Sequence, residues 1–265
     1  MNNQVSKIHT PLRWAGGKRW LAPFIRPIWN KYSNHRFVEP FCGGLGLTFE
    51  LLPEKALLND INTQLINFLR WLKTGLIIED NFEFSSDAYY RNRKRFNELI
   101  SDHKNHSKEA AFLFYYLNKT CFNGLCRFNR SGEFNVPYGQ RAKVQFEYNL
   151  SYYAKYMENW IIIEGSYENL EILENDFLFI DPPYDVPFRD YFKDGFIWED
   201  QERLAEWVSD LRVPVILCNH ATDRITELYN KYHFNISYLE EQILISANGN
   251  RQKSKMILAT KNIVI

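Results

Sequence analysis

The stretch FLFIDPPY, residues 177–184, decides the fold class that this sequence predicts. Four consecutive apolar residues are typical of a strand that is buried on both faces, and the turn at 181–184 ends that strand. The same arrangement recurs along the chain, where a short apolar run is followed by polar residues or glycine. We predict further strands of this kind at residues 36–38, 55–58, 160–163 and 213–217.

Helical patterns lie between these runs. Residues 62–72 place Leu65, Ile66, Leu69 and Leu72 on one face of a helix. Because strands and helices alternate, we predict an α/β frame whose parallel strands carry a site at their carboxyl ends. The other predicted helices span residues 46–52, 198–211 and 222–232.

The middle of the chain interrupts this alternation. Residues 75–115 read as helical and polar, and residues 118–143 are rich in Asn, Gly and Arg. We interpret residues 62–150 as an insertion that reads nucleic acid, with residues 1–61 and 151–265 forming the catalytic domain. A solvated loop is the alternative reading. Within 119–143, Glu133 is the one acidic residue, and the basic residues are Lys119, Arg127, Arg130, Arg141 and Lys143.

The composition limits the class of protein. The chain has 265 residues, zero formal net charge and 16% aromatic residues. This length fits one domain with an insertion. Zero net charge argues against a uniformly basic nucleic-acid binder, so any DNA-binding surface has to be local. The aromatic content fits either a packed core or a surface that stacks on bases.

The first ten residues are polar and do not resemble a signal peptide, and no apolar run is long enough to span a bilayer. We therefore expect a cytoplasmic protein of a bacterial or phage-infected cell, with reduced thiols and no membrane contact. Cys121 and Cys126 have C-x4-C spacing, but no second Cys/His pair follows at a zinc-like distance. We therefore expect no metal site.

The turn at residues 181–184 suits methylation of an aromatic amine. The lone pair of such an amine is delocalised into the ring, so acceptors for its two protons are needed to draw the nitrogen toward tetrahedral geometry. Asp181 supplies one acceptor, and the Pro182 carbonyl is the natural second, because neither Pro182 nor Pro183 has an N–H group. Tyr184 offers a ring on which a flipped base can stack. A plain strand-terminating turn is the alternative.

A second group of residues suits an adenosine-containing cofactor. Residues 39–46 form a Gly-rich turn whose backbone can approach a ligand closely, and Asp60 ends the next strand, where a carboxylate can bind ribose hydroxyls. Trp14 can pack on a cofactor, and Lys18 can pair with a carboxylate. These features alone do not separate S-adenosylmethionine from NAD. The cofactor-binding assignment comprises Trp14, Lys18, Glu39, Phe41, Gly43, Asp60, Ser166, Tyr167 and Asp181.

The motifs RWAGGK (13–18), EPFCGG (39–44), NDIN (59–62), FNGLCRFNRSGEFNVPYG (122–139) and DPPY (181–184), in this order, resemble the Dam-type adenine DNA methyltransferases of the alpha class. The basic stretch ISANGNRQKSK (245–255) also resembles that family. The resemblance implies a Rossmann-like methyltransferase domain with an inserted, mainly helical target-recognition domain. It implies S-adenosylmethionine as cofactor, double-stranded DNA as partner, and cofactor contacts at Trp14, Lys18, Asp60 and Asp181.

The resemblance also implies a target sequence. In family members that read GATC, base contacts come from positions that match Leu125, Arg127 and Pro137, with a basic residue that matches Arg13, so GATC is the favoured target. Phe122 is the position of a wedge that enters the base stack, where the family often has Tyr. The full DNA-contacting assignment comprises Arg13, Phe122, Asn123, Leu125, Arg127, Asn129, Arg130, Pro137, Arg141, Arg251 and Lys255.

One departure from the family pattern lies in the Gly-rich turn, where Leu45 replaces the second glycine of F-x-G-x-G and a glycine follows at Gly46. An N(4)-cytosine DNA methyltransferase is the nearest alternative function, because its amine poses the same chemical problem. An RNA or protein-glutamine methyltransferase, or a catalytically silent DNA- or NAD-binding module, is a further alternative. The resemblance implies no obligatory protein partner and leaves open whether a cognate restriction endonuclease exists.

Overall fold

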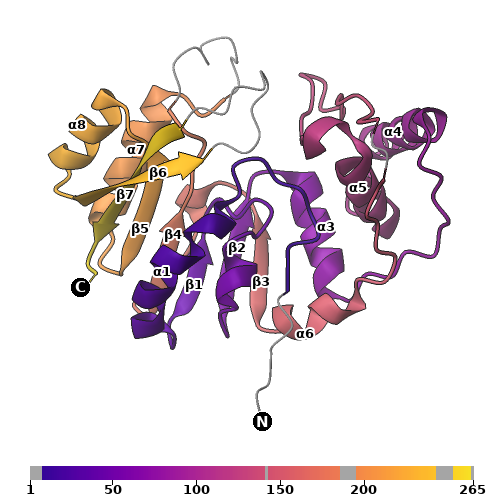
Figure 1. Ribbon diagram of the computed structural model, residues 1–265. Helices are drawn as coiled ribbons and strands as arrows, with labels where there is room; N and C mark the ends of the chain where they lie inside the picture. Colours follow the sequence, from indigo (N-terminus) through magenta and orange to yellow (C-terminus); the bar gives the residue numbers. More distant parts are fainter. Residues whose placement is uncertain (1–7, 141–142, 186–194, 243–252, 264–265) are drawn as a thin grey trace.

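The computed structural model describes residues 8–140, 143–185, 195–242 and 253–263 (Figure 1). Its strands form one sheet in the order β3-β2-β1-β4-β5-β7-β6, in which β1 to β5 are parallel and β7 runs antiparallel to β5 and β6. The α/β class and the five predicted strands are confirmed, whereas β6 and β7 were not predicted. The strands are β1 (Arg36–Glu39), β2 (Ala56–Asp60), β3 (Trp160–Glu164), β4 (Asp176–Ile180), β5 (Val215–His220), β6 (Asn235–Gln242) and β7 (Lys253–Lys261).

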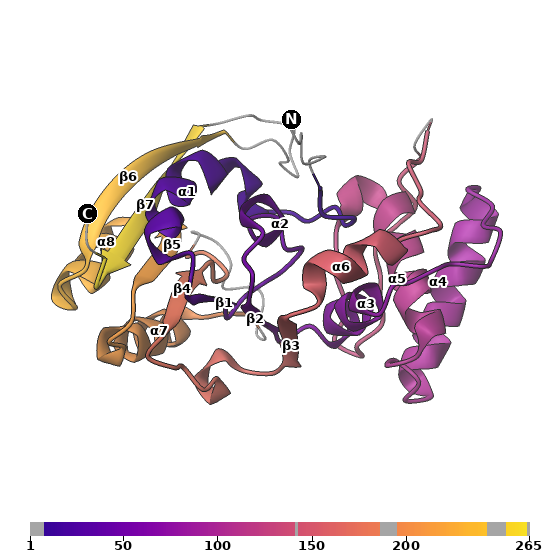
Figure 2. The same cartoon turned by 90° about the horizontal axis from the view of Figure 1, so that it is seen from below.

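Helices cover both faces of the sheet (Figure 2). Successive strand residues point to opposite faces, so that Phe177 and Phe179 belong to one core cluster and Leu178 and Ile180 to the other. Continuous apolar runs are therefore required in the central strands, which is why these were visible in the sequence. The first face carries α1 (Ala22–Trp29), α2 (Thr48–Leu51) and α3 (Thr63–Lys73), and the second carries α7 (Trp198–Asp210) and α8 (Asp223–Lys231).

The other two long helices, α4 (Ser86–Ser101) and α5 (Lys108–Thr120), stand to one side of the sheet (Figure 1). The prediction that residues 75–115 are polar is wrong for α5, because nine of its 13 residues are buried. This helix packs between α3 and α4, so it needs apolar residues on two faces. None of the helices in the described ranges is long and apolar enough to cross a membrane.

The strand order places two of the predicted motifs at one point. β1 pairs with β2 on one side and with β4 on the other, so the chain direction across the sheet reverses between β1 and β4. In open α/β sheets, ligands bind outside the carboxyl ends of the strands at such a switch point. The Gly-rich turn follows β1 and the 181–184 turn follows β4, so both lie at this position.

The short elements are η1 (Lys18–Leu21), η2 (Asn30–Tyr32), η3 (Phe122–Gly124), η4 (Ser151–Tyr153), η5 (Tyr167–Asn169) and α6 (Ala154–Met157).

Candidate active site and DNA-reading surface

The turn after β4 meets the N-terminal motif. The Lys18 Nζ atom lies 3.2 Å from Asp181 Oδ2 and 4.6 Å from the centroid of the Tyr184 ring. Lys18 is only 5% exposed, and its ammonium also donates to the Gly16 carbonyl. The carboxylate of Asp181 and the Gly16 carbonyl therefore compensate the cost of burying this ammonium. The structure brings together three residues that the sequence had assigned separately to catalysis and cofactor binding.

Tyr184 also has neighbours that the sequence analysis missed. Its hydroxyl hydrogen-bonds Met256 Sδ at 3.3 Å, and its ring lies edge-on to the His220 ring with 4.8 Å between centroids. His220 ends β5, directly after the predicted apolar run, and the polar residues closing that run were the available signal. Met256 gave no signal, because β7 was not recognised as the neighbour of β5.

Trp14 lies directly against the Gly-rich turn. A Cβ atom on Gly43 would be 2.6 Å from Trp14 Nε1, and one on Gly44 would be 2.6 Å from Trp14 Cβ, so neither position has room for a side chain. Gly43 has a φ of +46° and Leu45 a φ of +58°. Leu45 thus adopts the left-handed conformation at the position where the family pattern has glycine, at a cost of about 1–2 kcal/mol.

Asp60 is held by backbone groups at the carboxyl end of β2. The Gly43 N–H donates to its Oδ2 atom at 3.0 Å, and the Asn62 N–H donates to its Oδ1 atom at 2.9 Å. Burial raises the pKa of Asp60, and these N–H donors act in the opposite direction. Ile61, which follows this carboxylate in the chain and which the sequence analysis missed, is 79% exposed and presents an apolar side chain at the surface.

Asn59 ties three strand ends together. Its Nδ2 atom donates to the Pro40 carbonyl at 2.9 Å and to the Gly165 carbonyl at 3.0 Å, which joins the segments that follow β1 and β3. Its Oδ1 atom is buried and has no hydrogen-bond partner among the described residues. Such an acceptor is costly to bury unless a ligand or water pairs with it. This unpaired acceptor indicates that a polar ligand can bind beside the ends of β1, β2 and β3.

Glu39 is a buried carboxyl at the end of β1. It is 4% exposed, and it accepts a hydrogen bond from the Thr48 hydroxyl at 2.5 Å. Burial raises the pKa of Glu39 to about 8, the Thr48 hydrogen bond opposes that shift, and the nearby charge of Asp181 adds to it. Burial therefore favours the protonated form of Glu39 in the folded protein.

The assigned residues Phe41 and Tyr167 pack against each other with ring centroids 5.3 Å apart. The Tyr167 ring also lies 5.2 Å from the Trp207 ring of α7, so this pair belongs to the second core face. Ser166 caps η5, because its hydroxyl oxygen accepts a hydrogen bond from the Glu168 N–H at 3.3 Å. The segment after β3 is thereby fixed beside the Gly-rich turn.

The predicted wedge is exposed at the start of residues 122–139, which we call the recognition segment. Phe122 is 45% exposed in η3, and its N–H donates to the Pro137 carbonyl at 2.9 Å. Asn123 and Gly124 follow with φ of +54° and +67°. Two successive left-handed residues turn the chain sharply, so that the Phe122 ring is presented at the surface.

Arg13 lies in the same place although it is more than 100 positions away in the sequence. A Cβ atom on Gly124 would be 2.6 Å from Arg13 Cβ. Asn118 of α5, which the sequence analysis missed, accepts from the Arg13 N–H at 2.9 Å and donates to the Arg13 carbonyl at 2.8 Å. The Arg13 Nη1 atom is buried without a hydrogen-bond partner in the described part of the chain.

Arg127 and Asn129 lie on a small hairpin closed by a bridge between Phe128 and Phe134. The Arg127 Nε–H donates to Asn135 Oδ1 at 2.8 Å, while the side chain stays exposed. The Asn129 side-chain oxygen accepts from the backbone N–H groups of residues 131 and 133, so Asn129 shapes the turn.

Among the other assigned DNA contacts, Lys255 is exposed on β7, with its ammonium 4.0 Å from the centroid of the Tyr238 ring. Arg130 is exposed, Leu125 is half-buried, and Arg141 and Arg251 lie outside the described residues.

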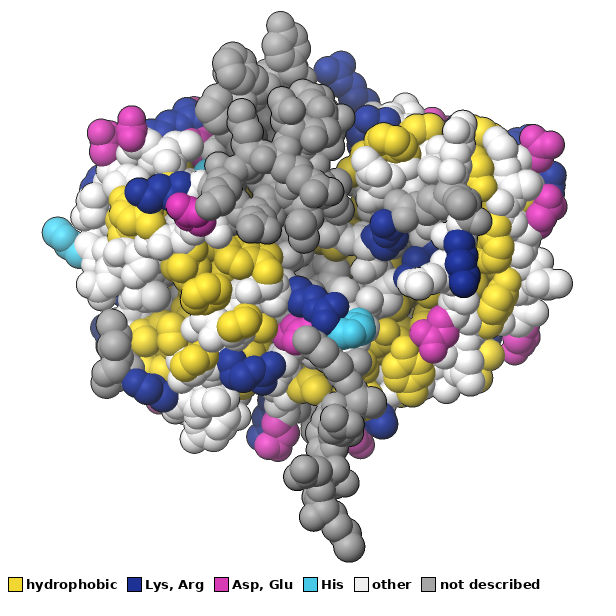
Figure 3. Space-filling view, in the orientation of Figure 1, with side chains coloured by type: hydrophobic (Ala, Val, Ile, Leu, Met, Phe, Trp, Pro, Cys, Tyr) yellow, Lys and Arg dark blue, Asp and Glu magenta, His cyan; other side chains and the backbone are white. Residues whose placement is uncertain are grey.

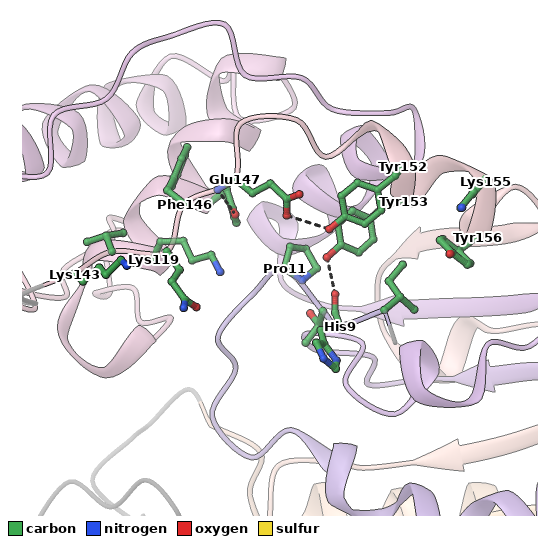
Figure 4. Close-up of a pocket in the computed structure, with 15 residues that line it drawn as sticks. His9, Pro11, Lys119, Lys143, Phe146, Glu147, Tyr152, Tyr153, Lys155 and Tyr156 are labelled. Atoms are coloured by element: carbon green, nitrogen blue, oxygen red, sulfur yellow. Dashed lines mark hydrogen bonds between the residues drawn. The ribbon is translucent and has the colours of Figure 1, made fainter. Parts of the chain in front are cut away.

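A separate cavity of about 790 Å³ lies between residues 8–11, residues 143–147 and the η4–α6 segment (Figure 4). Lys119 and Lys143 line it, and the Tyr152 hydroxyl donates to Glu147 Oε2 at its wall at 3.0 Å. No assigned catalytic or cofactor residue lines this cavity. The basic excess of residues 119–143 is thus divided between the cavity and the hairpin. Figure 3 shows Lys and Arg side chains on the face where the α4–α5 region meets the sheet.

A sheet with this order, an antiparallel β7 beside β5 and two motif turns at its switch point define an α/β enzyme of the methyltransferase class. Comparison with known proteins identifies the family. Residues 14–245 match the model of the D12 class N6 adenine-specific DNA methyltransferases, and the chain belongs to this family. It is an adenine-specific DNA methyltransferase, as the motif resemblance implied.

Relatives of similar length support this assignment. The type II methyltransferase M1.LlaDCHI of Lactococcus lactis subsp. cremoris is 34% identical over 264 residues, which cover 92% of this chain and 90% of the relative. A DNA adenine methylase of Vibrio cholerae serotype O1 is 34% identical over 267 residues, covering 94% of both chains. The retron Ec67 DNA adenine methylase of Escherichia coli is 31% identical over 266 residues, covering 94% of this chain and 90% of the relative.

Proposed function

We propose that the protein transfers a methyl group from S-adenosylmethionine to the exocyclic amine of an adenine that has been flipped out of double-stranded DNA. The observation that carries this proposal is the convergence of Lys18, Asp181 and Tyr184 at the switch point, beside the turn that Trp14 covers. An acceptor, an aromatic face and a cation are thus gathered at the carboxyl end of β4.

The residues of the crevice fit this cofactor. When it is bound, S-adenosylmethionine supplies an electrophilic methyl group on its sulfonium. Asp60 would accept from ribose hydroxyls, because a carboxylate has about four acceptor positions and the backbone N–H groups that bond it leave acceptor capacity over. Trp14 would pack on the cofactor, Lys18 would pair with its carboxylate, and the buried Asn59 oxygen would accept a hydrogen bond.

The chain's own residues activate the adenine amine. As a carboxylate, Asp181 accepts one amine proton in a hydrogen bond, and the Pro182 carbonyl accepts the other. Tyr184 stacks on the flipped base and limits its orientation. A strong general base is not required, because the nitrogen becomes acidic as it is alkylated and loses its proton late. Positioning and hydrogen bonding therefore account for the chemistry.

We propose that the insertion predicted at residues 62–150 reads the target, although α3 at its start packs on the sheet, and that the target is GATC. Arg13, Leu125, Arg127 and Pro137 would contact base edges, and Phe122 would fill the gap that the flipped adenine leaves. The exposure of Phe122 and the packing of Arg13 on Gly124 support this proposal. The other proposed DNA contacts are Asn123, Asn129, Arg130, Arg141, Arg251 and Lys255.

Purified protein, duplex DNA containing GATC and S-adenosylmethionine labelled on its methyl group test the reaction. We expect label in N6-methyladenine alone, and we expect S-adenosylmethionine, but not NAD, to raise the melting temperature. Label in N4-methylcytosine would contradict the proposed substrate. Protection by NAD in place of S-adenosylmethionine would contradict the proposed cofactor.

A further inference from the structure

Two buried amide side chains lie behind the catalytic turn, and no step described above uses them. Gln201 of α7 is 2% exposed, and Asn219 of β5 is fully buried. A buried primary amide is stable only when its donors and acceptors are paired, so the partners of these two side chains indicate what they hold in place.

The two amides form a chain of hydrogen bonds that ends on the turn backbone. The Gln201 Nε2 atom donates to the Pro183 carbonyl at 2.8 Å. The Asn219 Nδ2 atom donates to Gln201 Oε1 at 2.9 Å and to the Tyr229 hydroxyl at 3.2 Å. The Asn219 Oδ1 atom accepts from the Asp185 N–H at 3.1 Å. The backbone is therefore fixed by the carbonyl before Tyr184 and by the N–H after it.

A second set of contacts anchors the far end of the turn. The Asp185 carboxylate, 7% exposed, accepts from both Arg224 Nε and Arg224 Nη2, and the first of these bonds measures 2.6 Å. It also accepts from the Thr222 hydroxyl at 3.0 Å. Bidentate pairing with arginine fixes a carboxylate in one orientation. The turn is thus held from α7, from β5 and from the start of α8.

This arrangement distinguishes two adjacent carbonyls. The turn presents the carbonyls of Pro182 and Pro183, and only one of them can be the second acceptor for the amine. Gln201 donates to the Pro183 carbonyl and thereby fixes the direction of that carbonyl toward α7, whereas the Pro182 carbonyl accepts no hydrogen bond from any residue in the described ranges. The Asn219 donor in turn fixes which end of the Gln201 amide faces Pro183, because only the nitrogen end can donate.

We propose that Gln201 and Asn219 are positioning residues for methyl transfer. Gln201 engages the Pro183 carbonyl so that the Pro182 carbonyl, together with Asp181, faces the adenine amine. Asn219 orients the Gln201 amide and fixes the backbone after Tyr184. This inference rests on the proposed function, because it assumes that the Pro182 carbonyl receives an amine proton.

Isosteric variants separate positioning from packing. Gln201→Glu keeps the shape of the side chain but presents a carboxylate oxygen to the Pro183 carbonyl, and Asn219→Asp removes the donor that orients Gln201. Gln201→Met removes the hydrogen bond without burying a charge, so it covers the case in which the charged variants do not fold. Circular dichroism and thermal unfolding identify the folded variants.

The readout is single-turnover methyl transfer on duplex DNA at saturating S-adenosylmethionine. We expect each variant to lower the transfer rate about 10- to 100-fold, as loss of a preorganised hydrogen bond does, with the KM for DNA changed less than about threefold. As pH falls, Gln201→Glu should regain rate relative to the wild type, because a protonated Glu can donate to the Pro183 carbonyl. Gln201→Met should regain nothing. The ratio to the wild type removes the titration of the neighbouring Asp185, Tyr229, Arg224 and His220.

Folded variants with the wild-type transfer rate would overturn the inference and leave the proposed function intact. A rate loss shared equally by Gln201→Glu and Gln201→Met at every pH would overturn it as well, because that result indicates packing alone. A wild-type chain that transfers no methyl group to adenine would overturn the proposed function and this inference with it.

Discussion

The carboxyl edge of the sheet and the recognition segment treat their polar side chains in opposite ways. At the sheet edge, Lys18, Glu39 and Asp60 are buried or nearly so, and each has a specific partner. In the recognition segment, Arg127 and Arg130 are exposed, and the Arg127 Nε–H donates to Asn135 Oδ1 on the same hairpin. In the proposed function, this contrast would separate chemistry that is preorganised in the sheet from sequence reading by a surface that DNA completes.

The two regions meet through asparagine side chains. Asn118 bonds both backbone groups of Arg13, and Asn62 caps α3 while its Nδ2 atom reaches Cys126 Sγ at 3.5 Å. Asn62 also donates its N–H to Asp60, so this residue contacts both the edge of the sheet and the recognition segment. Substitutions confined to the sheet edge or to the recognition segment test whether the two regions act separately.

The largest effect is expected at Asp181. Asp181→Asn replaces a pure acceptor with a group that is half donor, so we expect methyl transfer to fall at least about 1,000-fold. DNA affinity measured by fluorescence anisotropy should stay within a few-fold, because the turn lies in the sheet and not in the recognition segment. Equal losses of DNA affinity and transfer rate would contradict the separation of the chemistry at the sheet edge from DNA reading in the recognition segment.

Arg127→Ala should act on specificity. Loss of a base-reading arginine is expected to cost about 1–3 kcal/mol in discrimination at one base pair of the target. Rates on duplexes with single substitutions in GATC measure this. Arg130→Ala, an exposed arginine on the same hairpin, is the matched control and should weaken binding equally for all duplexes. If both variants behave alike, Arg127 is not a base reader.

Glu39 gives a pH dependence of stability at the sheet edge. Its folded pKa of about 8 lies above the ordinary value, so between about pH 4.5 and 8 the folded chain holds a proton that the unfolded chain has released. Stability should therefore fall with rising pH in this window, by at most about 1.4 kcal/mol per pH unit. Glu39→Gln should remove that slope and stabilise the protein at pH 8 and above. Urea unfolding at several pH values measures it, and an unchanged slope would contradict the assignment.

The smallest effect is expected at the cavity of Figure 4. If DNA phosphates reach its edge, Lys143→Ala should lower affinity uniformly across sequences and reduce the slope of log affinity against log salt by about one. Titrations at several salt concentrations test this, with Lys155→Ala as a second lysine of the same cavity. Unchanged salt slopes for both variants would place the cavity outside the DNA path.

The sequence predicted the central strands and the helices between them, because a strand covered on both faces has to be continuously apolar. It did not reveal β6 and β7, since Asn235–Gln242 mixes polar and apolar residues in an antiparallel pair at the sheet edge. Motif residues such as Asp181 and Asp60 could be proposed from the sequence because their chemistry is local. Asn118, Gln201 and Asn219 were missed, since a buried amide acquires its role only from partners brought together by folding.

The most direct test of the central claim is expression of the wild-type chain and of Asp181→Ala in a host that lacks adenine methylation, followed by modification-sensitive sequencing of the host DNA. We expect N6-methyladenine in one short motif, GATC, with the wild type and none with Asp181→Ala. Methylation in another motif would overturn the roles of Leu125, Arg127 and Pro137 while keeping the reaction. Methylation that persists in Asp181→Ala, or none with well-folded wild type, would contradict the account at its centre.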